Sequence, residues 1–334
     1  MTPSWIPEHP SIVLASRARL ARNLENIPFR GVLPPQAARE FREHFGRILS
    51  ESTPLGPFVD ETTTDLVLLA DHLGIPSDLL ESGSPWAALR DGGRGAILLQ
   101  SDHFRLFAVR QGLDPIGALE DLAGLEPALA AAGTLARDPE WGWRTASPED
   151  VGTGLRSSVL LHAPALWLAR RVSNLSDGLE VLGGKLTSPW HQEDPGPLLV
   201  VSNRRTLGRT ELEIVADVQR WATRVRDEEE RATSDLVEHW GGDLRDSVHR
   251  SEAILASARL ISSGELVHRS ALAALGARLG WLSPSRGRDA LDLLLGTRDG
   301  TLRLRRAHEL PEAHPLLDDL RASETRILWN ARIS

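Results

Sequence analysis

Short apolar runs separated by polar segments predict a β-sheet in the first part of the chain. Residues 11–15 (SIVLA) and 198–201 (LLVV) are apolar and rich in β-branched side chains, which predicts buried strands. Residues 95–109 (GAILLQSDHFRLFAV) predict two strand segments, separated by the polar residues 100–103. Such a break inside an apolar run is a place where side chains can converge on a functional site.

Helical periodicity marks the segments between and after these runs. Residues 36–49 and 115–132 carry apolar side chains at every third or fourth position, which predicts a helix over each. A long helix is expected to begin at Thr210, because Thr210 and Glu213 have the spacing of a capping box. The sequence pattern therefore favours an α+β protein, with a sheet flanked by helices.

The pattern becomes helical alone beyond about residue 227, which indicates a boundary near residue 230. We expect a first domain over residues 1–228, containing the sheet, and a helical C-terminal domain over residues 229–334. The acidic run at 227–231 (DEEER) is interpreted as the solvated face of a helix.

Composition restricts the class of partner. The chain has 334 residues, 41% of them hydrophobic, so it can bury a substantial core. Its net charge of -8 argues against broad electrostatic binding to DNA or RNA. The absence of cysteine fits a reducing cytoplasm, and no apolar run approaches the roughly 20 residues that a membrane span needs. We expect a cytoplasmic protein that binds neither nucleic acid nor membrane.

Two short stretches are suited to binding anions. The first, SRARLAR, follows the first predicted strand and contains Arg17, Arg19 and Arg22. Arginines two apart on an extended segment project to the same side, where guanidinium groups suit phosphate oxygens, although a solvated face is the common explanation. The second, VGTGLR at 151–156, has glycines that let backbone N–H groups approach an anion, but it is not a full phosphate-loop pattern.

Taken together and in order, these blocks resemble a known family. The matching blocks are IVLASRARLARNLENIPF, DHFR at 102–105, WGWRTASPEDVGTGLRSSVLLHAPAL, SNRRTLGRTELEIV and SEAILASARLISSGE. They resemble the ATP:guanido phosphotransferases, and within them the bacterial protein arginine kinases, which phosphorylate arginine side chains in proteins. The resemblance implies an antiparallel, glutamine-synthetase-like sheet flanked by helices, and a C-terminal helical domain that supports a homodimer.

The resemblance also assigns residues to a nucleotide site that takes ATP, usually with Mg²⁺. The matching positions are Arg17, Arg19, Arg105 and Arg156 for the phosphates, with Gly152 and Gly154 close to the nucleotide. Fixed positive charges are what phosphoryl transfer requires of a protein. Arg22 lies outside the matched set and is expected at the surface.

The acceptor half of the family's site departs from the pattern. A guanidinium acceptor needs carboxylates that orient it and take up its proton. The family carries two of them in an Asn-Glu-Glu-Asp-His stretch, where this chain has Leu99, Gln100, Ser101, Asp102 and His103. The family's glutamate on a mobile loop falls on Trp190. Candidate substitutes are Asp102, Glu193 and Asp194, and the catalytic residues remain unassigned.

Further departures surround the phosphate half. The family's reactive cysteine is Ser147 here, and the following Thr-Asn pair is Glu149 and Asp150. Two carboxylates beside a phosphate site repel the nucleotide unless a magnesium ion or the arginines neutralise them.

Other polar groups give weaker signals. His191, with Glu193 and Asp194, offers metal-ligand types, but a polar loop explains them without a metal and no metal site is predicted. His103 and His162 lie in apolar stretches and are expected to be hydrogen-bonded structural histidines.

The C-terminal LDDLRA at 317–322 is an echo of the family's phosphoarginine-binding RDxxRA motif, with Leu317 in place of the first arginine. Asp318 could bind the guanidino group of phosphoarginine, and Arg321 could bind its phosphoryl group. An ordinary amphipathic helix explains the segment equally well.

Three functional hypotheses follow. The chain is an active, ATP-dependent protein arginine kinase with a rebuilt acid site, a non-catalytic relative, or an interaction protein without a ligand. We favour the second, a degenerate kinase that binds nucleotide or phosphoarginine and regulates partners. Its candidate partners are arginine-containing or phosphoarginine proteins, an active kinase, and a Clp-type protease system.

Overall fold

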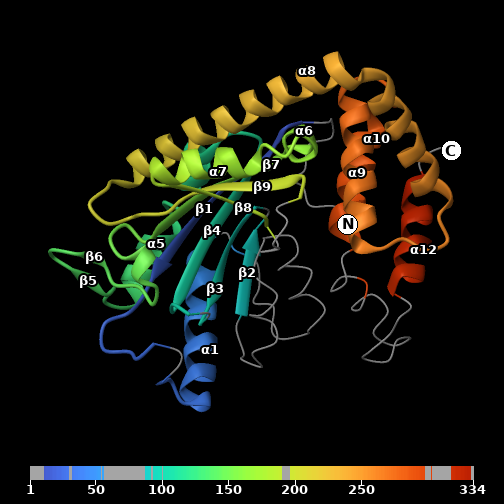
Figure 1. Cartoon of the computed structure of the whole chain (residues 1–334). Helices are drawn as coiled ribbons and strands as arrows, with labels where there is room; N and C mark the ends of the chain where they lie inside the picture. The colour runs from blue at the N-terminus through green and yellow to red at the C-terminus, as the bar shows by residue number, and fades with distance from the viewer. Residues whose placement is uncertain are drawn as a thin grey trace.

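The computed structural model describes residues 11–29, 32–53, 55, 87–91, 93–99, 101–189, 196–297, 302 and 317–331. Within them an antiparallel sheet carries helices on one face, and further helices follow at the C-terminal end (Figure 1). The α+β class expected from the sequence is confirmed. Gln100, Trp190, His191, Glu193 and Asp194 lie outside the described residues.

The described strands form one main sheet in the order β2-β3-β4-β1-β7-β9-β8, and every neighbouring pair is antiparallel. The strands are β1 (Val13–Arg22), β2 (Ala87–Asp91), β3 (Arg94–Leu98), β4 (Phe104–Gln111), β7 (Leu155–His162), β8 (Gly184–Thr187) and β9 (Leu198–Asn203). A separate hairpin pairs β5 (Arg137–Asp138) with β6 (Gly142–Trp143).

The helices are α1 (Pro35–Ser52), α4 (Pro115–Glu120), α5 (Leu125–Ala132), α6 (Pro164–Leu168), α7 (Val172–Val181), α8 (Glu211–Ser257), α9 (Ser263–Arg278), α10 (Ser285–Gly296) and α12 (Leu317–Asn330), with the 3-10 turn η2 (Pro148–Asp150). The capping box of Thr210 and Glu213 is present at the start of α8, as predicted. The helix expected over 115–132 is two helices, because Pro127 has no N–H to continue one helix through this segment.

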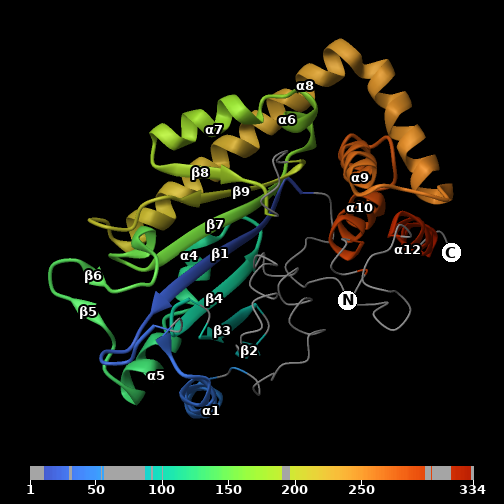
Figure 2. The same ribbon diagram turned by 60° about the horizontal axis from the view of Figure 1, so that its bottom comes forward.

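The first strand differs from its prediction. The apolar pattern ends it before the arginines, whereas β1 continues through Arg17 and Arg19 to Arg22. It lies between β4 and β7 in the middle of the sheet (Figure 2), so both of its edges form backbone hydrogen bonds. Paired ladders on two sides hold the arginine segment extended, although arginine has no strong preference for strands.

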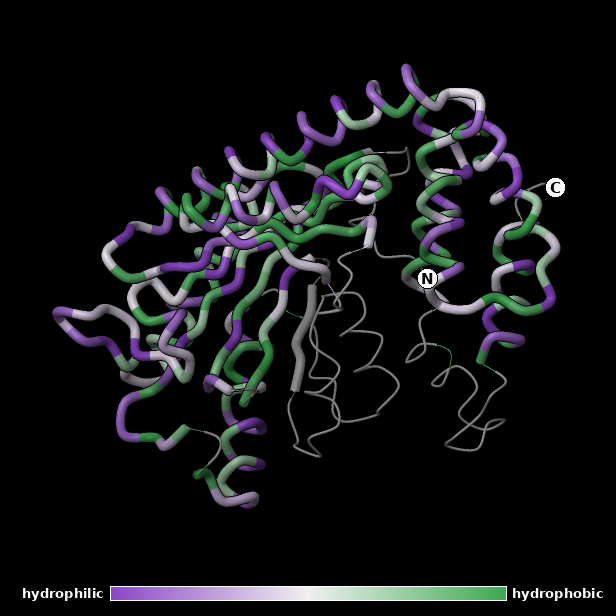
Figure 3. Tube along the Cα trace, viewed as in Figure 1, coloured by the Kyte–Doolittle hydropathy of each residue, from purple (hydrophilic) through white to green (hydrophobic). Residues whose placement is uncertain are grey.

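Helices cover one face of this sheet. Ala18 and Leu20 of β1 point to that face and pack with Phe41 and Phe45 of α1 and with Ile214 of α8. Further along the sheet, α7 and α8 cover the hydrophobic side chains of β7 and β9. Hydrophobic residues accordingly concentrate in the strands, while α8 alternates between hydrophobic and hydrophilic residues (Figure 3). Arg17 and Arg19 of β1 alternate with these core residues and therefore lie on the opposite face.

Helix α8 joins the sheet to the C-terminal helices. It runs along the sheet and beyond it, with a non-helical residue at Trp240, and the predicted boundary between residues 228 and 229 falls inside it (Figure 1). Residues of α8, α9, α10 and α12 share a second core around Trp329. No helix in the described part of the chain is both long and apolar enough to cross a membrane.

One residue of the acidic run is buried at this junction. The Glu229 carboxylate is 0% exposed and accepts hydrogen bonds from Ala165 N at 3.1 Å and Leu166 N at 2.8 Å. It also forms an ion pair with Arg278 of α9. The interpretation of this run as a solvated face is therefore wrong for Glu229, which links α6, α8 and α9.

Arg22 is also buried, at 1% exposure, and the expectation that it lies at the surface is wrong. Its guanidinium donates to Glu126 Oε2 at 2.9 Å from Nε and 2.6 Å from Nη2. It also donates to Thr153 O at 3.0 Å and lies 4.4 Å from the centre of the Trp143 ring. Arg22 thus connects β1 to α5, to the glycine-containing loop and to the β5–β6 hairpin.

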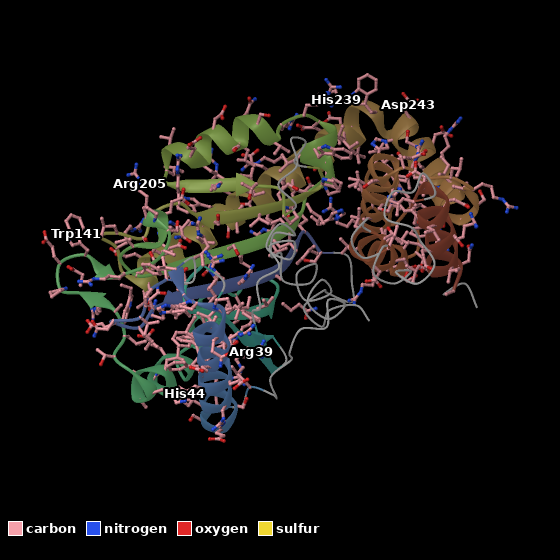
Figure 4. All side chains as sticks on the ribbon, turned by 90° about the horizontal axis from the view of Figure 1, so that it is seen from below. Arg39, His44, Trp141, Arg205, His239 and Asp243 are labelled. Atoms are coloured by element: carbon pink, nitrogen blue, oxygen red, sulfur yellow. The ribbon has the colours of Figure 1, made fainter. Side chains whose placement is uncertain are left out.

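The substitution Arg22→Ala is expected to lower the free energy of unfolding by about 3 kcal/mol, because it removes a buried side chain together with its hydrogen bonds to Glu126 and Thr153. Urea denaturation followed by circular dichroism measures the change. Arg39 is exposed on α1 (Figure 4), so Arg39→Ala is a matched control that should change the value by less than about 0.5 kcal/mol. Equal effects of the two substitutions would contradict the structural role of Arg22.

Candidate functional site

Strand register brings four arginines together on the face of the sheet opposite the described helices. Arg19 of β1 is directly opposite Arg156 of β7, and Ala21 of β1 is opposite Arg105 of β4. Arg17, Arg19 and Ala21 point to the same side because side chains alternate along a strand. The four arginines assigned to nucleotide phosphates are therefore neighbours on one face, although they come from three separated segments.

Asp150 lies between two of these arginines. Its Oδ2 is 3.2 Å from Arg19 Nη2, and its Oδ1 is 3.1 Å from Arg156 Nη2. The neighbouring Glu149 also pairs with Arg156 Nη2, at 3.2 Å. The Asp150 side chain is 3% exposed, whereas that of Glu149 is 61% exposed. The two carboxylates expected to repel a nucleotide are thus both in contact with the arginines.

The buried arginines of the cluster lower one another's pKa values. Burial, with the nearby charge of Arg105, lowers the pKa of Arg17 to about 10. Burial first, and then Arg105, lowers the pKa of Arg19 to about 9, against the opposing effect of Asp150. The buried Arg19 Nε has no hydrogen-bond partner among the described residues. A polyanion at this face would add negative charge beside the guanidinium groups and an acceptor for Arg19 Nε, so the residues fit a phosphate ligand.

The two glycines have structural reasons to be glycine. Gly152 has φ +115°, and a Cβ there would lie 2.8 Å from both Thr206 O and Leu207 Cα. Gly154 has φ +66°, and a Cβ there would lie 2.7 Å from Ala21 O. Both positions pack against backbone, which fixes the loop that carries Asp150 beside the arginines. Their contact with a nucleotide remains a prediction.

The acceptor side, as far as the structure describes it, contains Ser101 and Asp102. Arg105 Nη2 donates to Ser101 Oγ at 2.5 Å, and Arg105 Nε lies 3.6 Å from Asp102 Oδ2. The Asp102 side chain is 0% exposed. Its Oδ1 accepts hydrogen bonds from Asn23 Nδ2 at 2.9 Å and Ala146 N at 2.7 Å. Asp102 therefore holds three segments of the chain together behind Arg105.

Sequence reasoning assigned no role to three residues that hold this site in place. Asn23 also accepts from His103 N at 2.8 Å, and Asn203 Oδ1 accepts from Ser157 N at 2.8 Å. The Thr206 hydroxyl shares its one proton between Val151 O at 2.6 Å and Glu149 O at 3.0 Å. The sequence does contain a signal for such a residue: Asn203 is a polar residue directly at the end of an apolar strand, where a side chain can bond to neighbouring backbone.

The predicted structural role of His103 is confirmed. Its Nδ1 accepts from Leu24 N at 3.0 Å, so its Nε2 is the protonated nitrogen and donates to Pro28 O at 2.9 Å. Burial lowers the pKa of His103, which keeps the ring neutral. His162 is buried as well, and burial lowers its pKa to about 3, but its Nε2 has no hydrogen-bond partner among the described residues.

Arg321 is 2% exposed in α12. Its Nη1 donates to Ile261 O at 2.9 Å and to Asp318 Oδ1 at 2.5 Å. These contacts hold α12 against the loop before α9. Such a structural role agrees with the interpretation of this segment as an ordinary amphipathic helix. Recognition of phosphoarginine by Asp318 and Arg321 stays a prediction.

Comparisons with known proteins agree with this geometry. A family model described as the C-terminal catalytic domain of ATP:guanido phosphotransferases matches residues 93–232. The protein-arginine kinase of Symbiobacterium thermophilum is 31% identical over 338 residues, covering 98% of this chain and 94% of that relative. The protein-arginine kinase of Halothermothrix orenii is 32% identical and covers 80% of this chain and 79% of the relative.

Solved structures share the fold. Lombricine kinase aligns with a TM-score of 0.55 at 16% identity, over 70% of this chain and 72% of that chain. The duplicated taurocyamine kinase of Schistosoma mansoni, with transition state analog components bound, aligns with a TM-score of 0.58 at 19% identity. That alignment covers 74% of this chain and 39% of the duplicated one.

The fold of the chain is thus that of the guanidino kinases. The chain belongs to the ATP:guanido phosphotransferase family, as the resemblance implied. Members of this family use ATP, typically with Mg²⁺.

The glycine loop can be tested through stability. Gly152→Ala should lower the free energy of unfolding by about 3 kcal/mol, because it forces a strained φ and a clash with backbone. Gly178, inside α7, has open space around its Cβ position, so Gly178→Ala should instead raise stability by about 0.5 to 1 kcal/mol. Chemical denaturation of both variants measures the two changes. A tolerated alanine at position 152 would contradict the described loop.

Proposed function

We propose that this chain is a degenerate member of its family, which binds nucleotide phosphates on the arginine face and regulates partners without transferring a phosphoryl group efficiently. The observation that carries the proposal is the contrast between the two halves of the site. Four arginines converge on one face, whereas Ser101 stands where the family pattern has a glutamate.

Each arginine has a place in this proposal. Arg17, Arg19 and Arg156 would hold the phosphates from β1 and β7, and Arg105 would hold them from β4. Mg²⁺, when bound with ATP, supplies further charge neutralisation at the phosphates. The arginines position and neutralise the phosphate chain, which requires no proton transfer by the protein.

The acceptor chemistry is where we propose the loss. An acceptor guanidinium is protonated at neutral pH and becomes nucleophilic only when a positioned base removes its proton. Ser101 cannot take up that proton. Asp102 is fully buried and accepts hydrogen bonds from Asn23 and Ala146, so its position does not favour contact with an acceptor. Without a base, transfer would slow by about 10²- to 10⁴-fold.

An active protein arginine kinase with a rebuilt acid site is the alternative. It is favoured by the 31% identity with a protein-arginine kinase over 98% of the chain. Asp102, Glu193 or Asp194 would have to supply the acid in this alternative, because Trp190 occupies the family's loop position.

The proposal extends to partners and location. A regulatory relative of this kind would bind arginine-containing or phosphoarginine proteins, with Asp318 and Arg321 as a secondary candidate site. A Clp-type protease system is the candidate pathway, and we propose a cytoplasmic homodimer.

Nucleotide binding can be tested by thermal shift. MgATP should raise the melting temperature of the wild-type chain, since a ligand that binds only the folded state stabilises it. Arg156→Ala should weaken ATP binding about 10- to 100-fold, because it removes a charge-assisted contact. Arg205→Ala is a matched control, since Arg205 is exposed (Figure 4) and lies outside the four-arginine cluster. A wild-type chain that ATP and phosphoarginine both leave unshifted would support a role without a ligand.

Phosphoryl transfer needs a separate assay. The wild-type chain, incubated with Mg²⁺, labelled ATP and an arginine-rich protein, should produce acid-labile label at a rate about 10²-fold or more below that of an active relative assayed in parallel. Label at the rate of the active relative, lost in Arg156→Ala, would establish the alternative. The substitution Ser101→Glu restores a carboxylate at the family position, and a gain of label in this variant would identify the missing base as the cause.

A further inference from the structure

We propose that Asp150 is a built-in competitor for the phosphate site, so that it sets how tightly and in which charge state a phosphate ligand binds. This inference rests on the proposed function of nucleotide binding and names the residue that regulates it. Asp150 places a carboxylate between Arg19 and Arg156, where phosphate oxygens would otherwise accept the same hydrogen bonds.

The geometry is that of an anion already bound. One Asp150 oxygen accepts from Arg19 Nη2 at 3.2 Å and the other from Arg156 Nη2 at 3.1 Å. The side chain is 3% exposed, so the carboxylate is held among the arginines and is not a surface group that touches them in passing. A phosphoryl group using the same two donors must displace the carboxylate or share the donors with it.

The backbone on either side of Asp150 is held in place, so the Asp150 carboxylate stays close to Arg19 and Arg156 and competes continuously with a phosphate ligand. The Thr206 hydroxyl shares its proton between the carbonyls of Glu149 and Val151, on either side of Asp150. Gly152 packs against the backbone of residues 206 and 207. A tethered anion is present at a high effective concentration and cannot diffuse away, so a ligand competes with it at every binding event. The side chain can leave only by rotating about its own bonds.

The charges around Asp150 determine which form of the nucleotide binds better. Among the described residues, the four arginines lie beside three carboxylates: Glu149 and Asp150 pair with Arg19 and Arg156, and Asp102 lies behind Arg105, so much of the positive charge is neutralised before any ligand arrives. A highly charged free nucleotide meets repulsion from these carboxylates, whereas a nucleotide complexed with a divalent cation carries less negative charge. The site should therefore prefer MgATP to free ATP, and Asp150 should be the larger cause of that preference.

The opposite role makes the opposite prediction. If Asp150 served only to orient Arg19 and Arg156 for a ligand, its removal would disorder the arginines and weaken binding. Competition and orientation thus differ in the sign of the effect, and the same substitution separates them.

The test is calorimetric titration of the full-length chain with ATP, in Mg²⁺ and in EDTA, for wild type, Asp150→Asn and Glu149→Gln. We expect Asp150→Asn to tighten ATP binding about tenfold or more, with the larger gain in EDTA, because a like charge beside the phosphates is removed. The Glu149 substitution should change binding about threefold or less, because that side chain is largely exposed and its charge is screened by water.

The outcomes distinguish this inference from the proposed function. Wild-type binding that Asp150→Asn leaves unchanged or weakens overturns the inference and leaves nucleotide binding intact. Binding by Asp150→Asn alone supports the inference and shows that the wild-type site is closed to nucleotide. No binding by either overturns both. Circular dichroism checks that each variant is folded, and Asp150→Ser provides the same test if the asparagine variant is unstable.

Discussion

The structure depends on the pairing of β1 with β4 on one side and β7 on the other. This register places Arg19 opposite Arg156 and Ala21 opposite Arg105, so three distant segments present guanidinium groups on one face. The same register points Ala18 and Leu20 to the helices. A shift of one residue in β1 would bury the arginines and expose the core, so burial of the apolar face also fixes the site.

Placing several arginines on one face costs free energy, because their positive charges repel one another. Nearby carboxylates offset part of this repulsion. Burial and mutual repulsion lower the pKa of Arg17 and of Arg19. Asp150 opposes this at Arg19 from the glycine loop, and Asp102 lies behind Arg105. Arg22 shows a different solution, in which a buried guanidinium is surrounded by carboxylate, carbonyl and ring partners and serves only to join elements. Neighbouring arginines of one strand thus have opposite roles, set by the face on which each lies.

The residues that indicate the family differ from the residues that phosphoryl transfer to a guanidinium would need. The sheet and its helices share the fold of the guanidino kinases, and the sequence identity with protein-arginine kinases shows the family. Ser101, beside Arg105, stands on the acceptor side of the site. Phosphoryl transfer to a guanidinium needs a base there, which the fold alone does not provide. Hydrogen bonds from Asn23, Asn203 and Thr206 maintain the loops around the arginines whether or not transfer occurs. A preserved scaffold is therefore compatible with both of the functions considered.

The sequence by itself determined the elements whose causes are local: the strands at 95–109 and 198–201, the helix over 36–49 and the capping box at Thr210. The ordered arginine blocks also indicated the family before their geometry was known. Only the tertiary structure decided which arginines meet, that β1 extends to Arg22, and that Arg22 and Glu229 are buried. It also decided that Asp150, in a 3-10 turn, contacts Arg19 of β1, which is 131 residues away along the chain, and Arg156 of β7. Periodicity reports which face a residue prefers, whereas burial and charge pairing depend on partners that the chain brings together only when it folds.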